Sequence, residues 1–201
     1  MNNLQVNCVI GIDPGKAGGL AVFVPGKYTP YVTTAKMPKD VKELRDFFEY
    51  YVENYRPVVF LEKLSVRPDD VTEEGGRANL GKLYRIQKMI ANYEQLKAII
   101  ESVGIPFVMV HPMTWQTRLK LRVRGHKEDK RLRKRRYAEA ASSYFPDVKT
   151  TLWNADALLI MQFGRWALVN DLNWVEANLP EREYAKLFNE RNFYTLSNNL
   201  L

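Results

Sequence analysis

Three acidic residues lie in apolar stretches of the sequence, where an ordinary surface carboxylate is unexpected. Asp13 ends the run VIGID, Glu62 ends VVFLE, and Asp156 lies inside NADALLI. If the first two runs are neighbouring parallel strands, their carboxylates project from one edge of a sheet, where like charges repel unless a cation or a proton intervenes. Oxygen ligands without accompanying cysteines suit a hard ion, Mg²⁺ or Mn²⁺. The pattern therefore predicts a site for divalent cations.

Each acid also has a structural interpretation when it is considered singly. A carboxylate at the end of a strand can cap a helix, form a turn or pair with a basic side chain. The spacing alone therefore leaves a metal site and separate structural roles as open alternatives.

The net charge of +7 is concentrated in one segment. Residues 118–136, RLKLRVRGHKEDKRLRKRR, contain eleven Lys or Arg and two acids, a local charge of +9, which leaves −2 for the rest of the chain. Such a segment is expected in a protein that binds a polyanion, most simply nucleic acid, although a solvated helix face or a basic loop has the same composition. Beside nucleic acid, a carboxylate site that holds two divalent ions roughly 4 Å apart predicts phosphodiester cleavage.

The elements that must position these acids follow from hydrophobic periodicity and turn residues. Strands are predicted at 5–13, 18–24, 28–35, 57–62 and 105–112. Helices are predicted at 40–55, 83–100 with a stop at Gly104, 113–119, 135–145 with a stop at Pro146, and 153–169. Strands that alternate with helices after the first three strands indicate a partly parallel sheet with helices packed on it, an α/β fold.

The length and the composition predict one domain, residues 1–170, followed by a helical extension, residues 171–201, whose role is not legible. The single cysteine, Cys8, lies in an apolar run and excludes an internal disulfide framework or a multi-cysteine zinc site. No stretch is long and apolar enough for a membrane span, and the N-terminus lacks the basic flank of a signal peptide. These features predict a soluble protein of the cytoplasm.

The motifs GIDPGKAGG, VFLEKLS and NADALLI, in this order, resemble the RuvC-type Holliday junction resolvases (crossover junction endodeoxyribonucleases), in particular the short phage and prophage members. The segments ANLGKLYRIQKMI, GIPFVMVHPMTWQTRLKL and YFP extend the likeness, which covers residues 6–168. The resemblance implies an RNase H-like fold, a mixed five-stranded sheet flanked by helices. It also implies a Mg²⁺-dependent homodimer that nicks four-way DNA junctions, in the cytoplasm of a bacterium or a phage-infected host, and leaves 5′-phosphate and 3′-hydroxyl ends.

Residue by residue, the resemblance implies that Asp13, Glu62 and Asp156 hold two Mg²⁺ ions per active site, for which Mn²⁺ is a substitute. The family has a further acid or histidine shortly before the last aspartate, where this chain reads TTLWN. Asn154 is the predicted fourth ligand, with Asp147 or water as alternatives.

The catalytic basic residues of the family come from the region that matches the basic segment, so Lys127 or Lys130 is predicted to contact the scissile phosphate. Bacterial members carry an aromatic wedge three residues after the glutamate, and Ser65 stands there in this chain, so recognition is expected to extend to other branched DNA. The predicted DNA-binding residues are Lys16, Arg67, Arg118, Lys120, Arg122, Arg124, Arg131, Arg133, Lys134, Arg135 and Arg136.

Several other residues are expected to be structural. His111 precedes a proline at the end of a strand, and Trp115 is typical of a core anchor, whereas His126 belongs to the basic segment. The apolar stripe from Leu83 to Ile100 is expected to pack in the core, and in the family this helix also contributes to the dimer interface.

Two other functions fit parts of the sequence. The missing fourth acid is consistent with a non-catalytic protein that binds branched DNA through a degenerate nuclease site. A Gly-Ile-Asp-x-Gly hairpin also opens the actin-like and sugar-kinase-like ATPases, but these need a duplicated domain and a second phosphate motif, for which this chain is too short.

Overall fold

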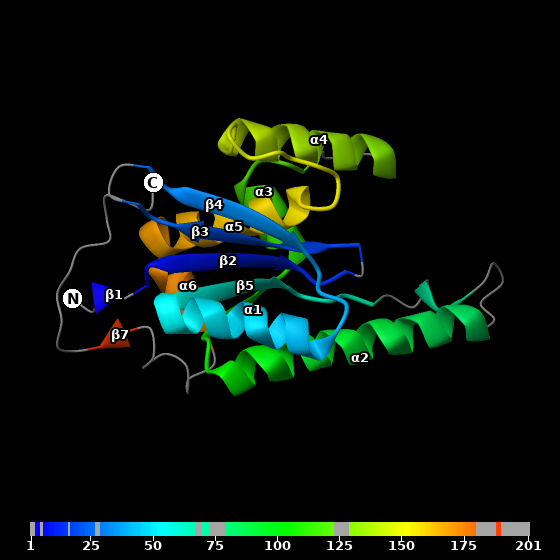
Figure 1. The fold of residues 1–201 in the computed structure, drawn as a ribbon. Coiled ribbons are helices and arrows are strands. Elements are labelled where there is room, and N and C mark those ends of the chain that lie inside the picture. The colour runs from blue at the N-terminus through cyan, green and yellow to red at the C-terminus, as the bar shows by residue number, and fades with distance from the viewer. Residues whose placement is uncertain are drawn as a thin grey trace.

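The computed structural model of the 201-residue chain describes residues 3–4, 6–15, 17–26, 29–66, 70–72, 79–122, 129–179 and 188–189. Its centre is a five-stranded sheet with helices on both faces (Figure 1). Across the sheet the strands are β4 (Tyr31–Lys36), β3 (Gly19–Val24), β2 (Cys8–Asp13), β5 (Pro57–Glu62) and β6 (Phe107–Val110). The predicted mixed five-stranded α/β sheet is confirmed.

The sheet combines an antiparallel half with a parallel half. β2, β3 and β4 form the predicted meander, while β5 lies parallel to β2 and β6 lies parallel to β5. The last strand is shorter than the predicted 105–112, because Pro106 has no N–H for the ladder and Pro112 begins the next helix. The parallel half brings the carboxyl ends of β2, β5 and β6 to the same edge.

Alternating side chains of the strands pack into two separate hydrophobic cores, one on each face of the sheet. On β2, Cys8, Ile10 and Ile12 face the core beneath α1 (Val41–Asn54) and α2 (Leu80–Val103). Val9 faces the opposite core, which contains much of α5 (Ala155–Asn170) together with residues of α3 (Pro112–Arg118), α4 (Lys130–Tyr144) and α6 (Leu172–Asn178). Because successive side chains of a strand point to opposite faces, Asp13 shares the α5 face with Val9.

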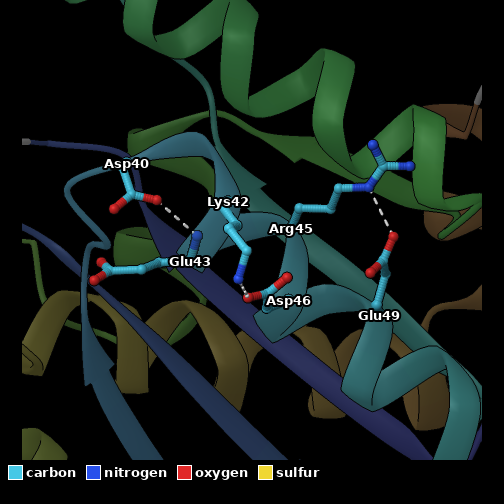
Figure 2. Close-up of polar contacts among 6 residues, drawn as sticks. All are labelled: Asp40, Lys42, Glu43, Arg45, Asp46 and Glu49. Carbon is cyan, nitrogen blue, oxygen red and sulfur yellow. Dashed lines mark hydrogen bonds and ion pairs between the residues drawn. The ribbon is translucent and has the colours of Figure 1, made fainter.

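Helix α1 begins at an N-cap on the solvent side of the molecule. The carboxylate of Asp40 accepts a hydrogen bond of 2.8 Å from the backbone N–H of Glu43, which satisfies one of the unpaired donors of the first turn. The exposed side of α1 carries two ion pairs at i,i+4 spacing, Lys42 with Asp46 at 3.0 Å and Arg45 with Glu49 at 2.7 Å (Figure 2). Exposed pairs stabilise little, so the buried side chains of α1 fix its position.

Helix α2 is the longest element and ends as predicted. Gly104 adopts the left-handed conformation that closes the helix, with φ of 80°. The C-terminal half buries Tyr93, Leu96 and Ile100 against the sheet. The N-terminal half extends past the sheet (Figure 1) and leaves apolar side chains exposed.

Two glycines let α5 lie directly against the centre of the sheet. A Cβ on Gly11 of β2 would lie 2.3 Å from the backbone nitrogen of Met161, and a Cβ on Gly164 of α5 would lie 2.4 Å from the ring of Phe60. No side chain larger than hydrogen fits at either contact. This close approach sets the start of α5, where Asp156 lies, next to the carboxyl end of β2.

The residues after 170 also contribute to the described fold. Val175 of α6 and Leu179 are buried in the same core as α5. Residues Asn3–Leu4 (β1) and Phe188–Asn189 (β7) form a separate antiparallel pair. The predicted boundary at residue 170 stays a prediction. None of the helices in the described part of the chain is long and apolar enough to cross a membrane.

Candidate active site

Asp13, Glu62 and Asp156 gather at one edge of the sheet. Ile12 pairs with Leu61 in the parallel ladder, so Asp13 and Glu62 end adjacent strands side by side. Phe60 faces the α5 core, and the alternation along β5 directs Glu62 to the same face. Asp156 lies in the first turn of α5, on that face. The structure therefore brings together the three acids that the sequence singles out.

Each carboxylate already has a donor from the protein. Asp13 Oδ1 accepts a 3.2 Å hydrogen bond from the backbone N–H of Gly15. Glu62 Oε2 accepts a 2.7 Å hydrogen bond from Nε1 of Trp115. Asp156 Oδ2 lies 2.6 Å from Nζ of Lys134. These contacts hold the acids at fixed positions instead of leaving them free in solvent.

Burial opposes ionisation at this edge. The pKa of Glu62 is raised to about 7, mainly because burial disfavours the carboxylate; the charges of Asp13 and Asp156 also raise it, while the hydrogen bond from Trp115 and the charge of Lys134 lower it. Burial and the charge of Asp156 likewise raise the pKa of Asp13, against lowering by the Gly15 N–H and by Lys134. Ionisation of all three acids is therefore unfavourable unless a cation balances their charge.

The oxygen ligands suit a hard divalent cation, but they do not form a closed ligand shell here. No group of three or more His, Cys, Asp or Glu side chains within the described ranges is arranged to hold a metal ion. One observation supports the fit: Asp156 Oδ1 is buried and has no hydrogen-bond partner in the described structure. A second observation concerns Gly18, where a Cβ would lie 2.9 Å from Asp13 Oδ2. Because glycine has no Cβ, this side of the Asp13 carboxylate stays open.

The side chain of Asn154, the predicted fourth ligand, makes hydrogen bonds through both ends of its amide, and its ligand role stays a prediction. Its Oδ1 accepts hydrogen bonds from the backbone N–H and the hydroxyl of Thr151, at 2.7 and 3.0 Å. Its Nδ2 donates to Thr34 Oγ1 and to the carbonyl of Lys149, both at 3.1 Å. With both ends of the amide engaged, Asn154 ties the start of α5 to β4 and to the preceding loop.

A tryptophan fills the stretch where the resemblance implied a further acid. The ring of Trp153 lies against the backbone of Gly19, where a Cβ would be 2.9 Å from the indole carbons. Lys36 Nζ lies 5.9 Å from the ring centroid, within range of a cation–π contact. Asp147, the alternative ligand, is exposed. The three carboxylates are the acids that the described structure offers at this edge.

Lys134 is the basic residue that reaches the acids. From the sequence, Lys134 was assigned only to DNA binding. Lys130, the predicted catalytic lysine, is exposed at the start of α4, and Lys127 lies outside the described residues. A signal for Lys134 is present in the sequence. Tyr137 follows it by three residues, so the two side chains share one face of the helix, and Tyr137 is buried.

Trp115 is the core anchor that the sequence predicted, and it also contacts the site. Its ring stacks edge-on against Tyr137 of α4 with 5.3 Å between centroids, while its N–H donates to Glu62. His111 caps α3, since its Nδ1 accepts from the backbone N–H of Met113, which matches the structural role expected for it. Trp115 and Lys134 thus link helix α4 to Glu62 and Asp156.

The predicted DNA-binding residues other than Lys134 fall into three groups. Arg118, whose side chain is half exposed, is 3.3 Å from Asp171 and stacks on Trp166, and Arg136 donates to the carbonyl of Leu121; their contacts with DNA stay predictions. The exposed residues are Lys120, Arg122, Arg131, Arg133 and Arg135. Lys16, Arg67, Arg124 and His126 lie outside the described residues, while Ser65 is exposed.

No protein-family model and no sequence among the curated proteins matches the chain. Among solved structures it is similar to Thermus thermophilus RuvC in complex with a Holliday junction substrate, with 16% identity, a TM-score of 0.50, and coverage of 80% of this chain and 94% of that chain. It is also similar to another structure of Thermus thermophilus RuvC, with 16% identity, a TM-score of 0.51, and coverage of 86% and 98%. These likenesses confirm the predicted RNase H-like fold.

Proposed function

We propose that this protein is a divalent-metal-dependent endonuclease that nicks branched DNA, principally four-way junctions, and leaves 5′-phosphate and 3′-hydroxyl ends. The observation that carries the proposal is the gathering of three partly buried carboxylates at one edge of a RuvC-like sheet, beside a helix with exposed arginines. The phage and prophage branch of the resolvases, and a cytoplasmic location in a bacterium or an infected host, are part of the same proposal.

Asp13, Glu62 and Asp156 are the proposed ligands of Mg²⁺, two ions per active site, with Mn²⁺ as a substitute. When bound, such ions stabilise the charge on the attacking and leaving oxygens of the phosphodiester. Trp115 supports the ionised form of Glu62 through its 2.7 Å hydrogen bond, against the burial that disfavours this form. Lys127 and Lys130 remain the proposed contacts to the scissile phosphate.

Binding is proposed to rest mainly on contacts to phosphates, which hold the DNA without reading its sequence. The exposed arginines of α4 are the best placed, because Lys134 on the same helix reaches the carboxylates. Ser65 offers no aromatic wedge, which favours recognition of several branched shapes over strict selection of the four-way junction. The proposed contacts are Lys16, Arg67, Lys120, Arg122, Arg124, Arg131, Arg133 and Arg135.

A nicking assay tests the proposal directly. Wild type, Asp13→Asn, Glu62→Gln and Asp156→Asn are incubated with a synthetic four-way junction and Mg²⁺, and Asp46→Asn, an exposed acid of α1, serves as the control. Wild type and Asp46→Asn should cut, and the three site variants should bind the junction without cutting. Sealing of the nicks by a DNA ligase reports the expected ends. Equal cutting by Asp13→Asn would overturn the assignment of the site.

A non-catalytic protein that binds branched DNA is the second candidate. Trp153 in the stretch where the resemblance implied an acid, and Lys134 against Asp156, favour it, because both reduce the ligands available to a cation. The same assay separates the two candidates. Tight junction binding by wild type with no cleavage in Mg²⁺ or Mn²⁺ would select the binding protein.

The proposed assembly is a homodimer formed through α2. Apolar side chains on its exposed half, among them Leu83 and Ile90, continue the stripe that is buried further along the same helix. A second copy would cover this continuation. Leu83→Glu with Ile90→Glu should convert a dimer to a monomer in sedimentation velocity experiments, and a wild type that sediments as a monomer would contradict the assembly.

A further inference from the structure

Lys134 is a basic side chain of α4 that reaches the carboxylate cluster. Its neighbours Arg133 and Arg135 are exposed, whereas its own side chain is 29% exposed and its Nζ lies 2.6 Å from Asp156 Oδ2. The direction follows from the packing of α4, because Tyr137, one turn later, is buried against Trp115. The docking of this helix therefore holds an ammonium group over the acids.

The charge of Lys134 acts on all three carboxylates. It pairs directly with Asp156, and it lowers the pKa of Asp13 and of Glu62 against the raising effect of burial. When the acids are ionised, three negative charges face one positive charge. A divalent cation would neutralise the two remaining negative charges. It would also give a partner to Asp156 Oδ1, which is buried and has no hydrogen bond in the described part of the chain.

The ammonium and a divalent cation need the same carboxylate. A cation bound to Asp156 would lie close to Lys134 Nζ, and like charges at such a separation repel each other more strongly at a partly buried site than in bulk water. The 2.6 Å ion pair must therefore lengthen or break for the cation to bind.

We propose that Lys134 is the resident counter-ion of this carboxylate cluster, which a divalent cation displaces from Asp156. The inference rests on the metal site of the proposed function and deepens it. Lys134 stabilises the cluster without a cation and weakens the binding of the cation. Its removal should have opposite effects on these two properties, which separates it from a residue that only supports the fold.

The test measures Mn²⁺ binding and thermal unfolding of the full chain without DNA. The electron paramagnetic resonance signal of free Mn²⁺ gives the affinity for Mn²⁺ chloride, and unfolding is followed with chelator and with saturating Mn²⁺. The variants are Lys134→Met, Lys134→Gln and Lys134→Arg. The control is Arg135→Met, which removes one charge from the next, exposed position of the same helix.

Lys134→Met and Lys134→Gln should bind Mn²⁺ about tenfold more tightly than wild type, because the repelling charge is gone. They should unfold at a lower temperature than wild type in chelator, and saturating Mn²⁺ should raise their unfolding temperature by more than it raises that of wild type. Lys134→Arg and Arg135→Met should stay within about twofold of wild type in Mn²⁺ affinity.

Unchanged or weaker Mn²⁺ binding by Lys134→Met and Lys134→Gln would overturn the counter-ion role while the metal site stands. Absence of Mn²⁺ binding in wild type and variants alike would overturn the metal site and the counter-ion together. Tighter Mn²⁺ binding by the variants, combined with no junction cleavage by wild type, would support the counter-ion and reject the nuclease.

Discussion

Glu62 is a carboxylate whose burial favours the protonated form in the folded protein. Its folded-state pKa of about 7 lies above the ordinary value of 4.5, because burial disfavours the carboxylate. The folded protein therefore holds a proton that the unfolded chain has lost between these two pH values. For a group with this direction of shift, the stabilising contribution is fully present below pH 4.5 and is lost as the pH rises through about 7.

The free energy of unfolding of the metal-free protein should accordingly fall by on the order of 3 kcal/mol between pH 4.5 and pH 7, at 1.36 kcal/mol per pKa unit. Glu62→Gln should flatten this dependence, since the amide has no proton to lose and still accepts the Trp115 hydrogen bond. Urea unfolding in chelator at a series of pH values measures it. Glu49→Gln, on the exposed face of α1 (Figure 2), is the control and should keep the wild-type slope. A slope that survives Glu62→Gln would assign the dependence to other groups.

Lys120 has the left-handed backbone conformation that favours glycine. Its φ is 57°, and the N–H groups of Lys120 and Leu121 close α3 by donating to the carbonyls of Thr117 and Gln116. A side chain in this conformation costs roughly 1–2 kcal/mol. The exposed ammonium of Lys120, in the basic segment, is a reason for a lysine at a position that suits glycine.

Lys120→Gly should raise the free energy of unfolding by about 1 kcal/mol and weaken junction binding. Lys120→Ala keeps the unfavourable backbone and removes the charge, so it should weaken binding equally without the gain in stability. Denaturant unfolding and fluorescence anisotropy with a labelled junction measure the two effects. Wild-type affinity in both variants would exclude Lys120 as a DNA contact.

At the scale of elements, α4 connects the basic surface to the acids through two contacts. Lys134 pairs with Asp156, and Tyr137 stacks on Trp115, which donates to Glu62. The helix that carries the exposed arginines is thus held by the same residues that hold the carboxylates. A shift of α4 would alter both at once.

Trp115→Phe tests this connection, since it keeps an aromatic ring beside Tyr137 and removes the indole donor. The loss of a hydrogen bond to a buried carboxylate, together with a smaller ring, should lower the free energy of unfolding by roughly 2–4 kcal/mol. A double-mutant cycle with Glu62→Gln isolates the contact. The two substitutions should be non-additive in stability and in cleavage rate, and strict additivity would mean that Trp115 only fills the core.

Most strands and helices of the sheet domain were predictable because period-two and period-3.6 patterns follow directly from burial on one face. Helix α4 begins at Lys130, before the predicted start at residue 135, and α6 was not placed in advance. The acids were predictable because Asp13 and Glu62 interrupt apolar runs that have no use for a charge. The contact of Lys134 with the acids was not predictable, because α4 is basic at almost every position of its first half. Only Tyr137, further along, marks the inner face of this helix. Asn154 was assigned to metal because its amide oxygen is a suitable ligand, while its contacts with Thr34 and Lys149 depend on tertiary structure.

At the scale of the molecule, the acids of the candidate site and the arginines of α4 differ in burial. The acids lie partly buried at the sheet edge, whereas Arg131, Arg133 and Arg135 stand in solvent on α4, on the α5 side of the sheet. Helices α1 and α2 cover the opposite face, where ion pairs neutralise Lys42, Arg45 and Lys97 locally. A polyanion should therefore approach from the α4 side.

The salt dependence of junction binding tests this direction of approach. Changing Arg131, Arg133 and Arg135 together to Gln should reduce the slope of log affinity against log salt by about 3, since each lost phosphate contact removes about one unit. Anisotropy titrations across a KCl series measure the slope. A matched variant with Lys42, Arg45 and Lys97 changed to Gln has the same net charge but lies on the opposite face, so it should keep nearly the wild-type slope. Equal losses in the two triple variants would mean that the DNA responds to net charge alone, and that α4 is not its binding surface.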